Sequence, residues 1–149
     1  MIDFYETAGA EASVDLQFSP GPALWAGVER TLVQQAVGNL ISNAIAHTPP
    51  GGTVMVALTN VTDTVQITVR DTGSGIAPQH LPHVFDRFYR ADRARTGSTH
   101  HVGLGLTLVR SIAGLHNGTV GIESKPGEGT CVTLRFPLVR VDQPKIANT

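Results

Sequence analysis

The chain is poor in cysteine, in aromatic residues and in charge, and each shortage excludes a class of protein. One of its 149 residues is cysteine, 5% are aromatic and 15% are charged. The single Cys131 cannot form an internal disulfide, so we expect a small buried thiol in a reducing compartment. A net charge of −1 gives no general attraction to nucleic acid or to an acidic membrane surface. No apolar run approaches the ~20 residues of a membrane span, and no signal peptide opens the chain.

What remains is the composition of one globular domain. Hydrophobic residues make up 41% of the chain, and 149 residues suffice to bury a core. We expect three parts. Residues 1–11 read as the end of a preceding helix or linker, residues 12–137 as the folded domain, and residues 138–149 as a frayed tail.

Hydrophobic periodicity predicts an α+β fold. Apolar residues at three- and four-residue steps predict helices over 28–47 and 103–116, and a short one over 78–88. Alternation predicts strands over 14–18, 23–25, 54–58, 65–69, 120–122 and 132–136. Adjacent antiparallel hairpins with the helices on one face give a two-layer α/β sandwich, with a mixed and mostly antiparallel sheet. A parallel, doubly wound sheet is not expected.

One face of the predicted long helix carries a row of polar side chains at four-residue spacing. The row consists of Gln35, Asn39, Asn43 and His47. Asparagine is a mediocre helix former, so two within one turn call for an explanation. A solvated helix face is the simplest one. The alternative is that the row faces a cleft, where amide oxygens can ligand Mg²⁺, which prefers oxygen and often shares phosphate oxygens with the protein.

A carboxylate followed at once by glycines ends the strand predicted over 65–69, in the run Asp71-Thr-Gly73-Ser-Gly75-Ile76. An ordinary turn between strand and helix explains this composition. The alternative is a base-reading site, because a carboxylate accepts a hydrogen bond from the exocyclic amine of adenine and repels a guanine carbonyl. Gly73 and Gly75 would then let the backbone approach the ring.

Two further segments suit phosphate. Four of the nine arginines crowd into nine residues, namely Arg87, Arg90, Arg93 and Arg95. They form either a solvated surface or a mobile lid whose guanidinium groups close over a triphosphate. Gly103 and Gly105 open the second long helix, where exposed N–H groups and the positive helix end favour phosphate.

Other cofactor and catalytic sites find little support. The glycines at 103 and 105 lack the third glycine and the βαβ context of a dinucleotide fingerprint, and no Walker Gly-Lys-Ser/Thr occurs. The pairs His80/His83 and His100/His101 have no cysteine or carboxylate at ligand spacing, so a zinc-type site is not expected. Neither serine nor histidine stands in a nucleophile-elbow context.

Four motifs in this order and spacing resemble the catalytic, ATP-binding domain of sensor histidine kinases, within the wider gyrase, chaperone, kinase and mismatch-repair ATPase superfamily. The resemblance covers roughly residues 12–137. It matches Asn39–Ala44 to the N box, Asp71–Ile76 to the first glycine box, Phe85–Arg90 to the F box and Gly103–Leu106 to the second glycine box. It implies a Bergerat-type sandwich with a mobile ATP lid. The opening segment Ile2–Glu6 also resembles metal-responsive sensor kinases.

The resemblance implies a role for each matching residue. Asn43 would hold Mg²⁺, with Asn39 beside it near the phosphates. Asp71 would read adenine, and Arg90 would act in catalysis from the lid together with both asparagines. The further residues expected at the nucleotide are His47, Gly73, Gly75, Ile76, Phe88, Arg95, Gly103, Leu104, Gly105, Leu106 and Thr130.

Three positions depart from the family pattern. Ala46 and His47 stand where a basic and then an aromatic residue are common, so a phosphate contact is either lost or supplied by His47 or the lid. His101 replaces a lid glycine, which would stiffen the lid. Asn117 replaces a glycine after His116, and we expect it to adopt the left-handed conformation of a helix cap. Nucleotide binding should survive all three.

The phosphate acceptor is expected outside this chain. The superfamily's hydrolases carry a glutamate, as general base, where this chain has Asn39, which cannot take the proton. An acceptor histidine is commonly followed by an acidic residue, and none of the six histidines here is. The resemblance therefore implies a cytoplasmic domain of an inner-membrane sensor protein. It would bind ATP or ADP and donate the γ-phosphoryl group to a histidine on a separate dimerisation domain.

The resemblance also implies the partners of the chain. A response regulator would be an indirect partner, and we expect the chain to bind no nucleic acid and to make no direct contact with a membrane. One alternative is a superfamily ATPase or a serine kinase that uses the pocket differently. The other is a non-catalytic module that binds nucleotide as a regulatory surface.

Overall fold

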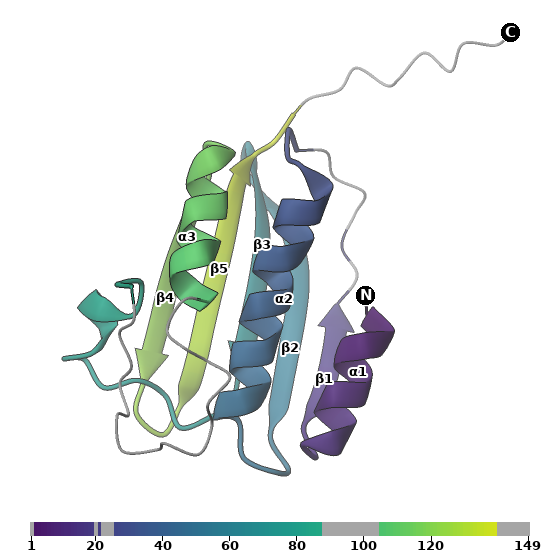
Figure 1. Cartoon of the computed structure of the whole chain (residues 1–149), viewed down its shortest axis with the longest axis vertical. Coiled ribbons are helices and arrows are strands. Elements are labelled where there is room, and N and C mark those ends of the chain that lie inside the picture. The colour runs from purple at the N-terminus through teal and green to yellow at the C-terminus, as the bar shows by residue number, and fades with distance from the viewer. Residues whose placement is uncertain (1, 20, 22–25, 88–104, 140–149) are drawn as a thin grey trace, which may run out of the picture.

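The structure, a computed structural model, describes residues 2–19, 21, 26–87 and 105–139. These residues form a five-stranded sheet and three α-helices (Figure 1). The strands are β1 (Asp15–Ser19), β2 (Thr53–Val61), β3 (Thr64–Asp71), β4 (Thr119–Lys125) and β5 (Gly129–Pro137). The helices are α1 (Ile2–Glu11), α2 (Arg30–His47) and α3 (Gly105–Leu115), with a 3₁₀ turn η1 (Leu81–His83).

The sheet has the order β1-β2-β3-β5-β4. β1 pairs in parallel with β2, and the other three pairings are antiparallel. The three α-helices lie together in front of the sheet (Figure 1). The predicted two-layer α+β sandwich with a mixed, mostly antiparallel sheet is therefore confirmed.

The register of the central strands decides which side chains meet the helices. Cross-strand partners point to the same face, and Val56, Val69 and Val132 are successive partners that are all buried. Residues one position away point to the opposite face, where Met55 is 40% exposed. Cys131 lies on this open face and is only half-buried. The expectation of a buried thiol is wrong, because its strand position faces away from the helices.

The long helix α2 follows the predicted periodicity and has a defined start and end. Oε2 of Glu29 accepts a hydrogen bond from the N–H of Leu32 at 2.7 Å, which caps the first turn. This bond lowers the pKa of the Glu29 carboxyl, and the charge of His116 adds to the shift. At the other end, the Thr48 hydroxyl donates to the carbonyl of Ala44 at 2.7 Å. The helix therefore begins two residues later than the periodicity suggested.

Residues 2–11 form a helix that packs on the rest of the domain. α1 lies beside α2 (Figure 1), and the hydroxyl of Tyr5 touches the backbone of Gly38 so closely that a Cβ there would collide with it. Tyr5 and Ala8 pack against the main core. Of the two expectations for this segment, a helix or a linker, the structure shows a helix, and the division at residue 11 stays a prediction.

The end of α3 shows the expected left-handed asparagine. Asn117 has φ +56°, the N–H of Gly118 donates to the carbonyl of Ala113 at 2.8 Å, and the N–H of Asn117 donates to that of Gly114 at 3.3 Å. This pair of bonds is a Schellman cap, and it turns the chain into β4.

Two predicted elements differ from, or fall outside, the described structure. The segment expected to form a helix over 78–88 contains only η1 in its described part. Its bonds join residues three apart, such as His83 N–H to the His80 carbonyl at 2.9 Å. Pro78 and Pro82 donate no backbone hydrogen bond, which disfavours a regular α-helix here. The strand predicted over 23–25 lies outside the described residues.

No helix among the described residues is both long and apolar enough to span a membrane.

Candidate functional site

Four chain segments that are far apart in sequence meet at one end of the sheet. They are the C-terminal end of α2, the loop after β3, the N-terminal end of α3 and the hairpin between β4 and β5 (Figure 1). Three of these segments carry motifs that the sequence singled out. The fourth, the hairpin, contributes Thr130 and a serine that sequence reasoning missed.

Asp71 is buried at the end of β3, with 7% of its surface exposed. Its Oδ1 accepts hydrogen bonds from the N–H of Gly73 at 2.8 Å and of Thr130 at 3.2 Å. Burial raises the pKa of the Asp71 carboxyl above its usual range, while those two bonds and the charge of His47 act against the rise. No described residue donates to Oδ2. The carboxylate is therefore held rigidly by one oxygen and presents the other as an acceptor.

The glycines after Asp71 are packed against protein backbone. A Cβ on Gly73 would collide with the carbonyl of His47. Gly75 has φ +73° and lies equally close to the carbonyl of Lys125. The close approach seen here is thus to α2 and to the β4–β5 hairpin, which fixes the loop on both sides. Their approach to a nucleotide ring stays a prediction.

The hairpin holds the same loop through side-chain and backbone bonds. The N–H of Ile76 donates to Oγ of Ser124 at 2.7 Å, and the N–H of Gly127 donates to the carbonyl of Ser74 at 2.7 Å. Ser124 also donates to the carbonyl of Gly129 at 2.8 Å and lies 2.8 Å from the Thr130 hydroxyl. Sequence reasoning missed Ser124, because its link to Ile76 spans 48 positions. The only signal was its place in the alternation of the final hairpin.

The asparagine row of α2 faces the start of α3. A Cβ on Gly105 would lie 3.3 Å from Nδ2 and 3.7 Å from Oδ1 of Asn43, so the amide of Asn43 covers the first residue of α3. Asn39 and Asn43 are half-buried, and the side chain of His47 is exposed. Within the predicted row, the side chain of Asn43 therefore lies against the N-terminus of α3, and the backbone carbonyl of His47 lies against Gly73 in the loop after Asp71.

The described ends of the lid segment are tied together. The hydroxyl of Thr107 donates to the carbonyl of Phe85 at 2.9 Å, and the guanidinium carbon of Arg110 lies 5.9 Å from the centre of the Phe85 ring. Leu106 packs against the core. The predicted site residues Phe88, Arg90, Arg95, Gly103 and Leu104 lie outside the described residues.

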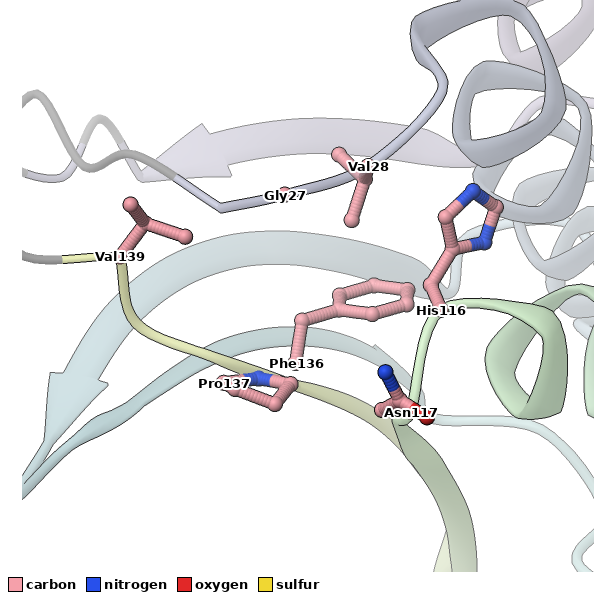
Figure 2. Close-up of a pocket in the computed structure, with 7 residues that line it drawn as sticks. All are labelled: Gly27, Val28, His116, Asn117, Phe136, Pro137 and Val139. Carbon is pink, nitrogen blue, oxygen red and sulfur yellow. The ribbon is translucent and has the colours of Figure 1, made fainter.

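Two cavities of the described part lie at the other end of the molecule. One, of about 150 Å³, is lined by Gly27, Val28, His116, Asn117, Phe136, Pro137 and Val139 (Figure 2). The other, of about 260 Å³, shares Asn117, Phe136 and Pro137 with it. Within the first, the ring of His116 meets that of Phe136 edge-on at 6.1 Å. Neither cavity contains a residue of the predicted site, so their chemistry is separate from it.

The described residues offer few of the usual metal-ligating groups together. They contain no group of three or more His, Cys, Asp or Glu that could ligand a metal ion. Asn43 offers one neutral oxygen, and the N-terminus of α3 beside it offers N–H groups that suit phosphate. This donor set fits an ion such as Mg²⁺ that takes its other ligands from water and a polyphosphate.

A family model described as histidine kinase-, DNA gyrase B- and HSP90-like ATPase matches residues 28–140 of the chain. The chain belongs to this family. Membership implies that this ATPase-family domain binds ATP. The matched range includes the N box, both glycine boxes and the F box predicted from the sequence.

The curated relatives are sensor kinases that are much longer than this chain. The sensor histidine kinase CusS of Escherichia coli strain K12 is 38% identical over 137 residues, which cover 92% of this chain and 28% of the relative. The sensor-like histidine kinase SenX3 of Mycobacterium tuberculosis strain H37Rv is 38% identical over 91% of this chain and 33% of its own length. Within the ATPase family, this chain is thus a catalytic domain of the sensor histidine kinase type.

A solved structure gives the same result for the fold. A mycobacterial sensor histidine kinase, MprB, superimposes with a TM-score of 0.76 at 26% identity, covering 92% of this chain and 91% of that one. The full-length kinase ShkA, in complex with AMPPNP, shares the fold with a TM-score of 0.77 at 24% identity.

Proposed function

We propose that this ATPase-family domain binds Mg·ATP and presents the γ-phosphoryl group to a histidine on a separate dimerisation domain. One observation carries the proposal. The amide of Asn43 lies against Gly105 at the start of α3, while the same helix contacts the Asp71 loop through the carbonyl of His47. The C-terminal half of α2 thereby connects the start of α3, which we propose binds phosphate, with the loop beside the buried carboxylate.

The adenine end of the site is assigned to Asp71. Its Oδ2 is the natural acceptor for the exocyclic amine of adenine, since Oδ1 is already engaged by two backbone N–H groups. Thr130, beside it on β5, and Ile76 in the loop complete this wall. A guanine carbonyl at the same place would meet a negative oxygen and be repelled.

The phosphate end is assigned to α2 and α3. Asn43 would hold Mg²⁺ by its amide oxygen, with Asn39 one turn away, and the first N–H groups of α3 would bind phosphate oxygens. When bound, the ion supplies neutralisation of the charge that develops on the transferred phosphoryl group. Arg90 and Arg95 of the lid segment are proposed to add further positive charge.

Transfer rather than hydrolysis is favoured by Asn39. An amide at this position cannot accept a proton from water, so bound ATP would persist until an acceptor arrives. The chain spans about 28–33% of the curated relatives named above, so there is room in such proteins for an acceptor domain. We propose that the parent protein is a membrane-anchored sensor with this domain in the cytoplasm, and that a response regulator takes the phosphoryl group next.

Phosphoryl transfer can be tested by mixing the chain with a dimerisation domain from such a parent and γ-labelled ATP. We expect acid-labile label on the acceptor, none when its histidine is changed to glutamine, and little with Asp71→Asn in this chain. Rapid phosphate release without acceptor would instead support the ATPase reading. Tight ATP binding with an unlabelled acceptor would support a regulatory module.

A further inference from the structure

Ser124 occupies a position that the proposed nucleotide site depends on. It lies near the end of β4 opposite Thr130 on β5, and Thr130 is in turn opposite Asp71 on β3. Cross-strand partners share a face, so three polar side chains stand side by side on the helix-facing side of the sheet. Ser124 is the outermost of the three, and it accepts a hydrogen bond from the N–H of Ile76 in the loop that follows Asp71.

The hydrogen-bond capacity of Ser124 is fully used. A hydroxyl has one hydrogen and two lone pairs. The Gly129 carbonyl, 2.8 Å away, can only accept, so it takes the hydrogen of Ser124. The N–H of Ile76, at 2.7 Å, can only donate, so it takes one lone pair. The contact with Oγ1 of Thr130 at 2.8 Å must then use the second lone pair, which makes Thr130 the donor.

This assignment fixes the direction in which the Thr130 hydroxyl donates its hydrogen bond. Its only hydroxyl hydrogen points to Ser124, so a ligand atom that reaches Oγ1 meets an acceptor. Oδ2 of Asp71 is also an acceptor. A wall with two acceptors suits an exocyclic amine and repels a carbonyl oxygen. Adenine has the amine at this position, whereas guanine has the carbonyl.

We infer that Ser124 is a positioning residue that sets the preference of the site for adenine over guanine. It acts by orienting the Thr130 hydroxyl and by holding the Ile76 N–H, and thereby the loop that follows Asp71. The inference rests on the proposed function. Without Ser124, the Thr130 hydrogen would be free to turn toward the ligand, and the Ile76 N–H would lose its partner.

Calorimetric titration of the chain with Mg·ATP and Mg·GTP tests this. Ser124→Ala should weaken ATP binding about tenfold and lower the ATP-to-GTP affinity ratio by roughly fivefold or more. Ser124→Thr keeps the hydroxyl on a strand that tolerates β-branching, so it should restore the ratio to within about threefold. Ser111→Ala removes an exposed serine of α3 and should change neither affinity.

Two further measurements make the outcomes decisive. In a Thr130→Val background, Ser124→Ala should alter the nucleotide ratio less than in the wild type, because only the contact with the Ile76 N–H is left to lose. Melting temperatures without nucleotide identify any loss of folding. If Ser124→Ala leaves the ratio unchanged, or weakens ATP and GTP equally, the inference is overturned. If Asp71→Asn also leaves ATP binding unchanged, the proposed function itself fails. If Asp71→Asn weakens ATP binding but Ser124→Ala does not change the ratio, only the role of Ser124 is refuted.

Discussion

The side-chain amide of Asn43 covers the first residue of α3, so that a Cβ on Gly105 would lie 3.3 Å from its Nδ2. The two residues belong to separate motifs, the N box and the second glycine box. Their contact links the proposed metal ligand to the proposed phosphate-binding helix end. It therefore also gives a way to disturb the site without touching the core.

Gly105→Ala should weaken Mg·ATP binding while leaving the fold intact. The added Cβ must push the Asn43 amide by a few tenths of an ångström, for which we expect a loss of about 1 kcal/mol, roughly fivefold in affinity. Gly114→Ala is the matched control, because α3 has open space beside Gly114. That control should raise the free energy of unfolding by about 0.5–1 kcal/mol and leave ATP binding unchanged. Equal affinity for both variants by calorimetry would contradict the contact's role.

Asp71→Asn should move stability and affinity in opposite directions. Asparagine keeps an Oδ1 acceptor for Gly73 and Thr130 but removes a buried charge whose desolvation raises the carboxyl pKa. Unfolding of the nucleotide-free variant by urea at pH 7 should show unchanged or increased stability. ATP binding should weaken by about 1.5–3 kcal/mol, or 10- to 150-fold. A variant that unfolds more easily and binds ATP normally would argue that Asp71 is a structural residue only.

The raised pKa of Asp71 also predicts a pH dependence of stability with a definite sign. From the ordinary value of 3.8 up to the raised pKa, the folded protein holds a proton that the unfolded chain has released. The free energy of unfolding of the wild type, relative to Asp71→Asn, should therefore fall as pH rises through this window. ATP affinity should change the other way and decline as the pH is lowered and Asp71 is protonated. A wild-type-to-variant difference that is flat with pH would refute the buried carboxylate.

Asn117→Gly should stabilise the domain. Asn117 has φ +56°, a conformation that glycine adopts without steric cost, and the Schellman bonds around it use only backbone atoms. We expect a gain of about 0.5–1 kcal/mol in thermal or urea unfolding. Asn117→Val should lose at least as much, since β-branching is costly at positive φ. Neither change should affect nucleotide binding, because Asn117 lies at the opposite end of the sheet.

The elements that the sequence predicted well are those with a strongly periodic pattern of hydrophobic residues that face the core. The stripe on α2 and the alternation in β3 and β5 belong to the same buried interface, so the positions of these elements followed from the pattern. The segment around Pro78 and Pro82 has no such stripe, and helix was predicted where only a 3₁₀ turn forms. Cys131 was misplaced because alternation marks two faces without saying which one the helices cover.

The sequence indicated the motifs of the candidate site but not the residues that hold those motifs in place. Asp71, Asn43 and Gly105 stand out locally, since each is an unusual residue at the end or on the face of a regular element. Ser124 and the carbonyl of Lys125 act across strand pairings that a linear pattern does not contain. Gly73 and Gly75 lie against backbone carbonyls of other segments, and a linear pattern does not show which segments the fold brings beside them.

A crystal structure of the chain with Mg²⁺ and a non-hydrolysable ATP analogue tests the central claim most directly. The account predicts the adenine amine within hydrogen-bonding distance of the Asp71 carboxylate, and Mg²⁺ and the phosphates beside Asn43 and the start of α3. A nucleotide bound in the cavity around His116 and Phe136, or one whose base lies away from Asp71, would contradict it.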